Sequence, residues 1–371
     1  MKQTELIEGG KPMLPATPYV ENRLRSRKSR SGFYKRESKT LSKAEKCVDL
    51  RQIQEAAKRI EPYIQRTPTV SDNVLSERFD SNFYLKLELL QNTGAFKVRG
   101  AFNKMLTLTE EERRRAGGIV AVSAGNHAQA VAYAARELGQ KALILMPEDT
   151  PQNYLSETRR YGAEIELLPT MADAFTKAKE YEREGRVYIH PFDDPLVIAG
   201  QGTIGLEILE DVPEVTDVVV SIGGGGLAGG VAAAIKSLRP EVNIWGVETK
   251  GADSMAEALK ADEVVELSQV TSIARTLCAP AVGRLAFQLA RRFLSGVTVV
   301  EDGEAVEELF FLLDRAKVLT EPATACTLAA AERLREYFTP SSHVVLILCG
   351  GNLGLADLFK LRSLTSSEIV G

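Results

Sequence analysis

Three short stretches of this sequence contain residues that could do chemistry together. The first is "TGAFKVRGA", residues 93–101, in which Lys97 follows a phenylalanine and precedes a valine. A charged amine is costly to bury unless it is paired or neutralised. Lys97 therefore either lies on the exposed side of a helix, or is kept neutral inside the protein and reacts covalently with a ligand.

The second stretch, "SIGGGGLAGG" at residues 221–230, places four consecutive glycines between an apolar run and a helical run. Glycine has no Cβ, so this backbone can turn tightly and bring several N–H groups close to one ligand. Together with the positive end of the following helix, these donors favour a phosphate group. The alternative is a tight strand-to-helix turn without a ligand. No Walker lysine follows the glycines, which argues against ATP.

The third stretch, "SAGNHAQ" at residues 123–129, offers a hydroxyl, an amide and backbone donors at the start of a helix. It is either an ordinary helix cap, made by Ser123 or Asn126, or a second and smaller anion site suited to a carboxylate. Pyridoxal phosphate needs a phosphate site and a lysine, and an amino-acid substrate brings a carboxylate. The three stretches together predict that Lys97 carries pyridoxal phosphate.

The elements that must position these stretches alternate between strands and helices from about residue 117. We predict strands at 118–123, 141–147, 163–169, 186–191, 217–222, 243–249 and 343–349, and helices at 127–139, 151–162, 171–185, 195–211 and 227–238. The strands are apolar throughout, which indicates sheets covered by helices on both faces. The alternation indicates mostly parallel strands. Such sheets bind ligands beyond the carboxyl ends of their strands, where both loops lie.

Composition narrows the class of protein further. The chain has 371 residues, 44% hydrophobic and 26% charged, as expected for a soluble globular protein of two domains. A net charge of -4 gives no reason to expect nucleic acid or a membrane as partner. No apolar run reaches the roughly 18 residues that a membrane helix needs. Four scattered cysteines predict reduced thiols and a cytoplasmic location, and three distant histidines argue against a multi-histidine metal centre.

Seven ordered stretches between about residues 60 and 355 resemble the fold-type II pyridoxal-phosphate enzymes, specifically the threonine/serine dehydratase and serine racemase group. They are "TGAFKVRGA", "SAGNHAQAVAYAA", "HPFDDPLVIAGQGTIGLEIL", "SIGGGGLAGGVA", "GVET", "EPATA" and "LCGGN". The resemblance implies an α/β fold like that of the tryptophan synthase β subunit, with mostly parallel sheets and helices on both faces. It also implies a homo-oligomer, either a dimer or a tetramer.

The same resemblance divides the chain into parts. Residues 47–86 and 167–371 would form a large cofactor-binding domain, and residues 87–166 a small domain. Residues 1–46 are basic and rich in serine towards their end, so we expect a disordered extension, with an organelle transit peptide as the alternative. Because few residues follow the last matching stretch, we expect no C-terminal regulatory domain.

The resemblance also assigns roles to site residues. Lys97 would carry the cofactor and act as the base on Cα, and Phe96 would pack beside the ring. Asn126 would hydrogen-bond the phenolic oxygen of the ring, and Cys349 would contact the pyridine nitrogen. The alternative for Cys349 is a small buried residue that ends a core strand. The phosphate would bind to the backbone of Gly223, Gly224, Gly225, Gly226 and Leu227, and the substrate carboxylate to the loop that contains Ser123, Ala124 and His127.

The reaction implied is a β-elimination: dehydration and deamination of L-threonine or L-serine to 2-oxobutanoate or pyruvate plus ammonia. A protonated thiol at position 349 is only a weak donor, and elimination tolerates the modest electron sink that results. Related racemases have a serine that returns the proton to Cα where this chain has Ala124, which favours elimination. The alternatives are a serine racemase, a dehydratase of another β-hydroxy amino acid, and a non-catalytic pyridoxal-phosphate-binding protein.

A cation site is implied as well. Glu248, Ala252 and Ser254 lie in "ETKGADS", where related racemases bind a divalent ion with an aspartate at the last of these positions. The resemblance implies that a serine at position 254 suits a monovalent ion such as K⁺. The alternative is that Glu248 makes only a structural salt bridge or hydrogen bond.

Overall fold

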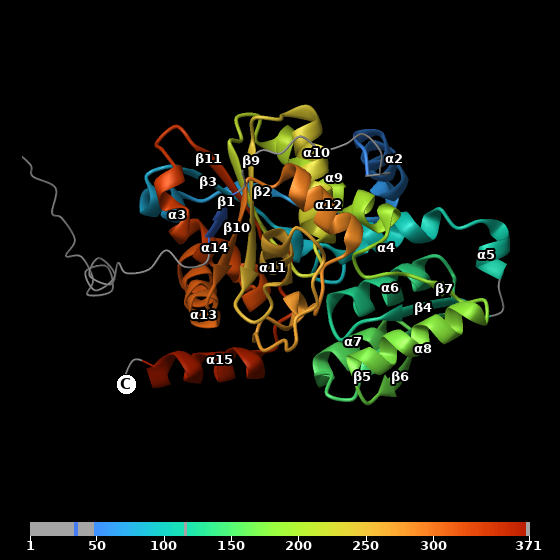
Figure 1. Ribbon diagram of the computed structural model, residues 1–371. Coiled ribbons are helices and arrows are strands. Elements are labelled where there is room, and N and C mark those ends of the chain that lie inside the picture. The colour runs from blue at the N-terminus through green and yellow to red at the C-terminus, as the bar shows by residue number, and fades with distance from the viewer. Residues whose placement is uncertain (1–32, 36–47, 115–116, 369–371) are drawn as a thin grey trace, which may run out of the picture. The chain divides into compact units, whose positions relative to one another are not determined.

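The computed structural model describes residues 33–35, 48–114 and 117–368, and the strands in this part of the chain form two sheets (Figure 1). Most of the predicted extension, residues 1–46, lies outside the described residues. Its one described segment is β1, Phe33–Lys35, which pairs antiparallel with β10, Gly296–Val300. The prediction of disorder for the extension is therefore left open.

The larger sheet has the strand order β1-β10-β9-β8-β11-β3-β2. Its inner strands pair in parallel, and only the edge strands β1 and β2 pair antiparallel. Besides β1 and β10, its strands are β2 Thr69–Ser71, β3 Asn82–Lys86, β8 Asp217–Ser221, β9 Asn243–Thr249 and β11 His343–Ile347. The smaller sheet, in the order β6-β5-β4-β7, is parallel throughout. Its strands are β4 Ile119–Val122, β5 Ala142–Pro147, β6 Glu164–Leu168 and β7 Val187–Tyr188.

Helices connect the strands and cover both sheets. They are α2 Leu50–Ile60, α3 Asn73–Phe79, α4 Lys97–Leu106, α5 Glu110–Arg114, α6 Asn126–Glu137, α7 Gln152–Arg160, α8 Met171–Arg183, α9 Pro195–Asp211, α10 Gly226–Leu238, α11 Ser254–Ala261, α12 Arg284–Phe293, α13 Asp302–Phe311, α14 Pro322–Arg333 and α15 Leu355–Glu368. Short helical turns lie at η1 Glu61–Tyr63, η2 Glu88–Leu90, η3 Arg275–Leu277, η4 Leu312–Ala316 and η5 Arg335–Tyr337.

Strand β8 shows why these strands are apolar throughout. Successive side chains of a strand point to opposite faces of the sheet. Val218 and Val220 pack in a core that includes residues of α10 and α12, whereas Val219 packs in a second core with residues of α13 and α14. Both faces of the sheet are therefore buried. The predicted fold class, two mostly parallel sheets with helices on both faces, is confirmed.

The smaller sheet is covered on both faces in the same way. Ala121 and Ile144 pack with residues of α4 and α6, and Val120 and Leu145 pack with residues of α8. Strands β6 and β7 carry this sheet to Tyr188, past residue 166, the predicted end of the small domain. The predicted domain limits stay a prediction, and this sheet gives a reason to move that limit toward residue 190.

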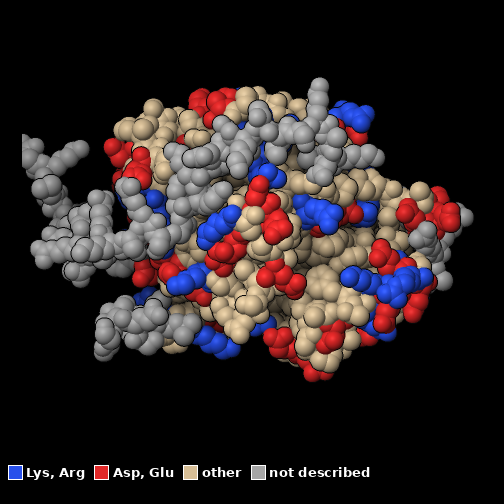
Figure 2. Space-filling view, in the orientation of Figure 1, with Lys and Arg blue, Asp and Glu red and all other residues tan. Residues whose placement is uncertain are grey.

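Two further observations concern the surface. Among the described residues, no helix has both the length and the apolar character needed to cross a membrane. On the face shown in Figure 2, lysine and arginine side chains are interspersed with aspartate and glutamate side chains rather than gathered into a field of one sign.

Candidate active site

One cavity of about 1220 Å³ is lined by residues from the ends and loops of both sheets. It brings together residues that are far apart in the sequence. Every predicted cofactor-binding and substrate-binding residue lines it: Phe96, Lys97, Ser123, Ala124, Asn126, His127, Gly223, Gly224, Gly225, Gly226, Leu227 and Cys349. The three predicted cation ligands, Glu248, Ala252 and Ser254, are not among its lining residues.

Lys97 is the first residue of α4, and its amine lines the cavity rather than an outer helix surface. The Nζ atom donates a hydrogen bond of 2.7 Å to the carbonyl oxygen of Pro191 and lies 5.1 Å from the centre of the Phe96 ring. Burial lowers the pKa of Lys97 to about 8. About one in ten of these amines is therefore neutral at pH 7, far more than for an ordinary lysine, and a neutral amine can attack a carbonyl carbon.

The glycine run joins β8 to α10 and leaves the N-terminus of α10 open toward the cavity. Gly225 is the N-cap residue, with φ of +86°, and no side chain caps the helix. A Cβ on Gly224 would overlap the ring of Phe192, so only glycine fits there. The first N–H groups of a helix have no partner within it. Those of α10 are consequently available to an anion in the cavity.

The loop before α6 forms a second open helix N-terminus on the same cavity. Its N-cap residue is Gly125, and again no side chain caps the helix. Ser123 Oγ instead accepts a bond of 3.0 Å from the N–H of Gly125, and Asn126 bonds elsewhere. The alternative in which Ser123 or Asn126 caps this helix is therefore wrong.

His127 is buried and neutral, because burial and the nearby Lys97 lower its pKa to about 3. Its Nε2 lies 2.9 Å from the carbonyl oxygen of Ile189, so Nε2 carries the proton and Nδ1 is an acceptor without a partner. An acceptor nitrogen cannot donate to a carboxylate. Any contribution of His127 to binding a substrate carboxylate would thus come from its backbone N–H.

Comparisons with known proteins identify the family to which this chain belongs. The family described as "Pyridoxal-phosphate dependent enzyme" matches residues 60–350, well over half of the chain. The chain belongs to the pyridoxal-phosphate dependent enzymes. The predicted cofactor is therefore confirmed.

Several members of this family are similar over most of their length. The chain is 42% identical over 308 residues to the L-threonine ammonia-lyase of Thermotoga maritima, covering 82% of this chain and 76% of that one. It is 38% identical over 318 residues to the catabolic L-threonine dehydratase of Escherichia coli (strain K12), covering 85% and 96%. The structure of maize serine racemase superposes with a TM-score of 0.79 at 34% identity, covering 88% of this chain and all of that one.

The residues of the cavity fit pyridoxal phosphate. The open N-terminus of α10 suits the phosphate, and the Lys97 amine suits the aldehyde. Cys349 is buried, with Sγ 3.2 Å from Thr324 Oγ1, and burial raises the pKa of its thiol to about 12. Such a neutral thiol would give the pyridine nitrogen a weak hydrogen-bonding partner without a negative charge, and this role for position 349 stays a prediction.

Some residues of the cavity are not identified by sequence reasoning. Pro191 and Phe192 belong to "HPFDDP", and Glu321 to "EPATA", stretches that resemble the family but leave these residues without a role. Tyr154, on α7, lies in a stretch that the sequence predicts only as a helix. Pro191, Phe192 and Glu321 could have been identified, because they lie in stretches that match the family. No sequence pattern indicates that Tyr154 lines the cavity.

The predicted cation ligands form a separate small site. Both carboxylate oxygens of Glu248 accept backbone N–H bonds of 2.8 Å, from Met255 and Ala256 at the start of α11. Burial nevertheless raises the pKa of Glu248 to about 8. The Oγ atom of Ser254 is buried without a hydrogen-bonding partner. Among the described residues, no group of three or more His, Cys, Asp or Glu could hold a metal ion, and Glu248 is the one carboxylate among the three predicted ligands.

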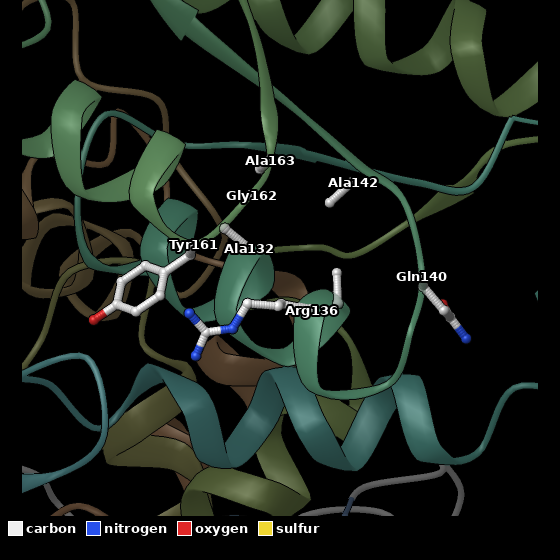
Figure 3. A pocket seen from close by; sticks show the side chains of 8 residues that line it. Ala132, Arg136, Gln140, Ala142, Tyr161, Gly162 and Ala163 are labelled. Carbon is white, nitrogen blue, oxygen red and sulfur yellow. The ribbon is translucent and has the colours of Figure 1, made fainter.

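A smaller pocket of about 250 Å³ lies beside α6 and contains none of the predicted site residues (Figure 3). The guanidinium group of Arg136 lies at its edge, 5.4 Å from the centre of the Tyr161 ring. Arg136 also pairs with Glu137 at 2.8 Å, so its charge is already compensated. This pocket offers no reactive group for the chemistry of the large cavity.

Proposed function

We propose that this chain is a pyridoxal-phosphate-dependent ammonia-lyase that converts L-threonine or L-serine to 2-oxobutanoate or pyruvate plus ammonia. One observation carries the proposal: the Lys97 amine, with its lowered pKa, shares a cavity with two uncapped helix N-termini. One helix end suits the cofactor phosphate and the other an amino-acid carboxylate. The relatives named for L-threonine support the choice of substrate.

The bound cofactor supplies an electron-withdrawing ring that acidifies the Cα–H bond of the substrate. The chain's own residues do the rest. The N–H groups at the start of α10 hold the phosphate, and those at the start of α6 hold the substrate carboxylate and so orient Cα. Neutral Lys97 then takes the proton from Cα at its Nζ atom. Burial makes the free base of this amine accessible near neutral pH, and its hydrogen bond goes to a backbone carbonyl rather than to a carboxylate.

Ala124 supports elimination rather than racemisation. Racemisation needs a second group that can deliver a proton to Cα on the face opposite Lys97. The methyl group of Ala124 lines the cavity and carries no exchangeable proton. Introducing a hydroxyl by Ala124→Ser is expected to produce D-serine from L-serine, measured by chiral chromatography, where the unmodified protein produces none.

The test measures visible absorbance and keto-acid release from the purified protein with L-threonine, L-serine and other β-hydroxy amino acids. We expect absorbance from bound cofactor, keto acid from L-threonine or L-serine, and loss of both in Lys97→Ala. D-serine formed without keto acid would assign a racemase. Keto acid only from a different β-hydroxy amino acid would assign another dehydratase. Cofactor absorbance without any product would assign a non-catalytic binding protein.

We also propose that Glu248, Ala252 and Ser254 bind a monovalent cation such as K⁺. The unpartnered Ser254 Oγ and the single carboxylate support a site of low charge. Added K⁺ is expected to raise the melting temperature of the protein relative to the same concentration of choline, and Glu248→Gln to remove this difference. Equal melting temperatures in the two salts would exclude the site.

The remaining expectations are a cytoplasmic location and a homo-oligomer, a dimer or a tetramer. Reduced thiols support the first, and Cys278, Cys326 and Cys349 are all free. The second is carried by the family resemblance. Light scattering of the purified protein measures its mass and decides between a monomer, a dimer and a tetramer.

A further inference from the structure

Four residues are linked in a ring of hydrogen-bonding contacts at the wall of the active-site cavity, and Asn352 takes part through both its side chain and its backbone carbonyl. Asn126 Nδ2 donates to Glu321 Oε1 at 2.8 Å, and Asn352 Nδ2 donates to Asn126 Oδ1 at 2.9 Å. The hydroxyl of Tyr154 closes the ring, at 3.2 Å from the carbonyl oxygen of Asn352 and 3.4 Å from Glu321 Oε2. Asn126, Tyr154 and Glu321 are all buried.

One backbone carbonyl determines how every amide in this ring is oriented. Asn352 Nδ2 also donates to the carbonyl oxygen of Thr93 at 2.7 Å. A carbonyl oxygen only accepts, so the NH₂ end of the Asn352 side chain must face Thr93. The same NH₂ group then requires the oxygen of Asn126 on its other side. The NH₂ end of Asn126 consequently faces Glu321, whichever protonation state that carboxyl group has.

This arrangement leaves Asn126 one hydrogen that no other group in the ring uses. An amide NH₂ group has two donors, and Glu321 takes one of them. The second hydrogen of the Asn126 amide is left over, and the Asn126 side chain lines the cavity that also contains Lys97. If the amide were turned over, its oxygen would face a cofactor oxygen instead and repel it.

The anchoring carbonyl itself belongs to a strained turn that leads into Lys97. Thr93 has φ of +79°, which is unfavourable for a β-branched residue, and Gly94 follows with φ of +69°. A Cβ on Gly94 would overlap the side-chain oxygen of Asn352. Asn352 therefore packs on this turn and bonds to it. The Asn352 amide therefore bonds both to the turn that precedes Lys97 and to the side chain of Asn126.

We propose that Asn352 and Glu321 are positioning residues that hold the Asn126 amide with a free N–H directed at the phenolic oxygen of the cofactor ring. This inference rests on the proposed function, because it needs pyridoxal phosphate on Lys97. It adds two residues that act through Asn126 and do not themselves touch the reacting atoms.

The test is Asn352→Asp, read by the absorption spectrum of the bound cofactor. The new carboxylate cannot donate, so the Asn126 amide turns over and the ring oxygen loses its donor. The two cofactor bands that report the protonated and deprotonated ring oxygen should change in ratio by about tenfold toward the protonated form, as expected for one lost hydrogen bond. The dissociation constant for pyridoxal phosphate should rise by a similar factor.

The matched control is Asn82→Asp. Asn82 also donates to two backbone carbonyls, of Pro340 and Ser342, but unlike Asn352 it bonds to no residue that lines the cavity. Its substitution should leave the band ratio unchanged. A second pair covers the case in which Asn352→Asp does not fold: Glu321→Ala should shift the ratio in the same direction, and Glu321→Gln, which keeps an acceptor oxygen, should restore it.

An unchanged band ratio in folded, cofactor-loaded Asn352→Asp or Glu321→Ala would overturn this inference while leaving the proposed function intact. Failure of the proposed function has a different signature, since the unsubstituted protein would then release no keto acid from L-threonine or L-serine, whatever its cofactor absorbance.

Discussion

Two cationic residues at the start of α4 differ in whether carboxylates compensate their charge. Lys97 faces the cavity, where its amine bonds to one backbone carbonyl and its pKa is lowered by burial. Arg99, two residues later, is fully buried on the other side, where its guanidinium group bonds to both Glu88 and Glu207. Residues two apart on a helix point in different directions, so one helix turn presents a reactive base on one side and a fixed charge on the other.

Arg99 belongs to a buried ion cluster, defined here as Lys86, Glu88, Arg99 and Glu207. Arg99 Nη2 lies 2.8 Å from Glu88 Oε1, Arg99 Nη1 lies 2.6 Å from Glu207 Oε1, and Lys86 Nζ lies 2.6 Å from Glu207 Oε2. Burial alone would lower the pKa of Arg99, but the two carboxylates outweigh it and raise the pKa. Two positive and two negative charges thus neutralise one another.

The comparison teaches that a buried cation indicates function only when its charge is left uncompensated. The ion cluster links α4 to β3, a strand of the larger sheet, and to helix α9. Lys97 is held in place by the same helix, yet its amine remains a weak base. Compensation of charge stabilises structure, and its absence makes a reactive amine.

The largest effect is expected from Arg99→Met. Removing this cation leaves Glu88 and part of the charge of Glu207 buried without a cationic partner. Such a change typically costs about 3–5 kcal/mol in the free energy of unfolding. Urea unfolding of the apoprotein measures it.

The control for this substitution is Arg51→Met. Arg51 pairs with Glu55 at 4.0 Å on the surface, with side chains 79% and 53% exposed. Its loss should change the free energy of unfolding by less than about 1 kcal/mol. Equal losses in the two variants would show that the ion cluster contributes no more than an exposed pair.

The second prediction concerns the pH dependence of cofactor attachment to Lys97. Only the neutral amine attacks the aldehyde, and the pKa of Lys97 is about 8. The rate of attachment to the apoprotein should therefore rise about tenfold per pH unit below pH 8 and level off above it. Stopped-flow absorbance after adding pyridoxal phosphate measures the rate. A rate that continues to rise to pH 10 would indicate an ordinary exposed lysine.

The cavity side of this comparison is predictable from the sequence to a large extent. "TGAFKVRGA" and the glycine run predict the cofactor site, because four glycines exceed what a turn alone needs and an amine among apolar residues is costly without a reactive role. The alternation of apolar runs predicts β4 to β9, β11 and the helices α6 to α10 to within a few residues. It does not predict strands β1, β2, β3 and β10, although "GVTVV" at residues 296–300 has the composition of a buried strand.

The ion cluster and the ring around Asn126 could not be predicted in this way. In the sequence, Arg99 is only a polar neighbour that makes exposure of Lys97 plausible. Its partners Glu88 and Glu207 lie 11 and 108 residues away, and local patterns carry no information on such pairs. Asn352 and Thr93 are 259 residues apart, so the same reason applies to them. Charged or amide residues in an apolar context indicate burial, but the fold alone decides which partner each one meets.

A smaller effect is expected from Thr203→Val. Thr203 Oγ1 accepts a bond of 3.1 Å from Arg99 Nη1 and donates one of 2.7 Å to the carbonyl oxygen of Gly200, so the substitution removes both bonds but leaves both carboxylates. The free energy of unfolding should fall by about 1 kcal/mol. Thr320→Val is the matched control, because Thr320 is equally buried and its Oγ1 has no hydrogen-bonding partner. A loss in Thr320→Val as large as in Thr203→Val would show that volume and shape, rather than the bond to Arg99, determine the cost.

The smallest effect on stability is expected from Lys97→Met, although it abolishes cofactor attachment. The amine has one neutral partner and is partly buried, so an apolar side chain of similar length removes a desolvation cost along with one hydrogen bond. The free energy of unfolding of the apoprotein should change by less than about 1 kcal/mol, or rise, in the same urea assay. A loss comparable to that of Arg99→Met would mean that Lys97 is charged and structurally paired. The contrast between the two cations, and with it the account of Lys97 as a free base, would then fail.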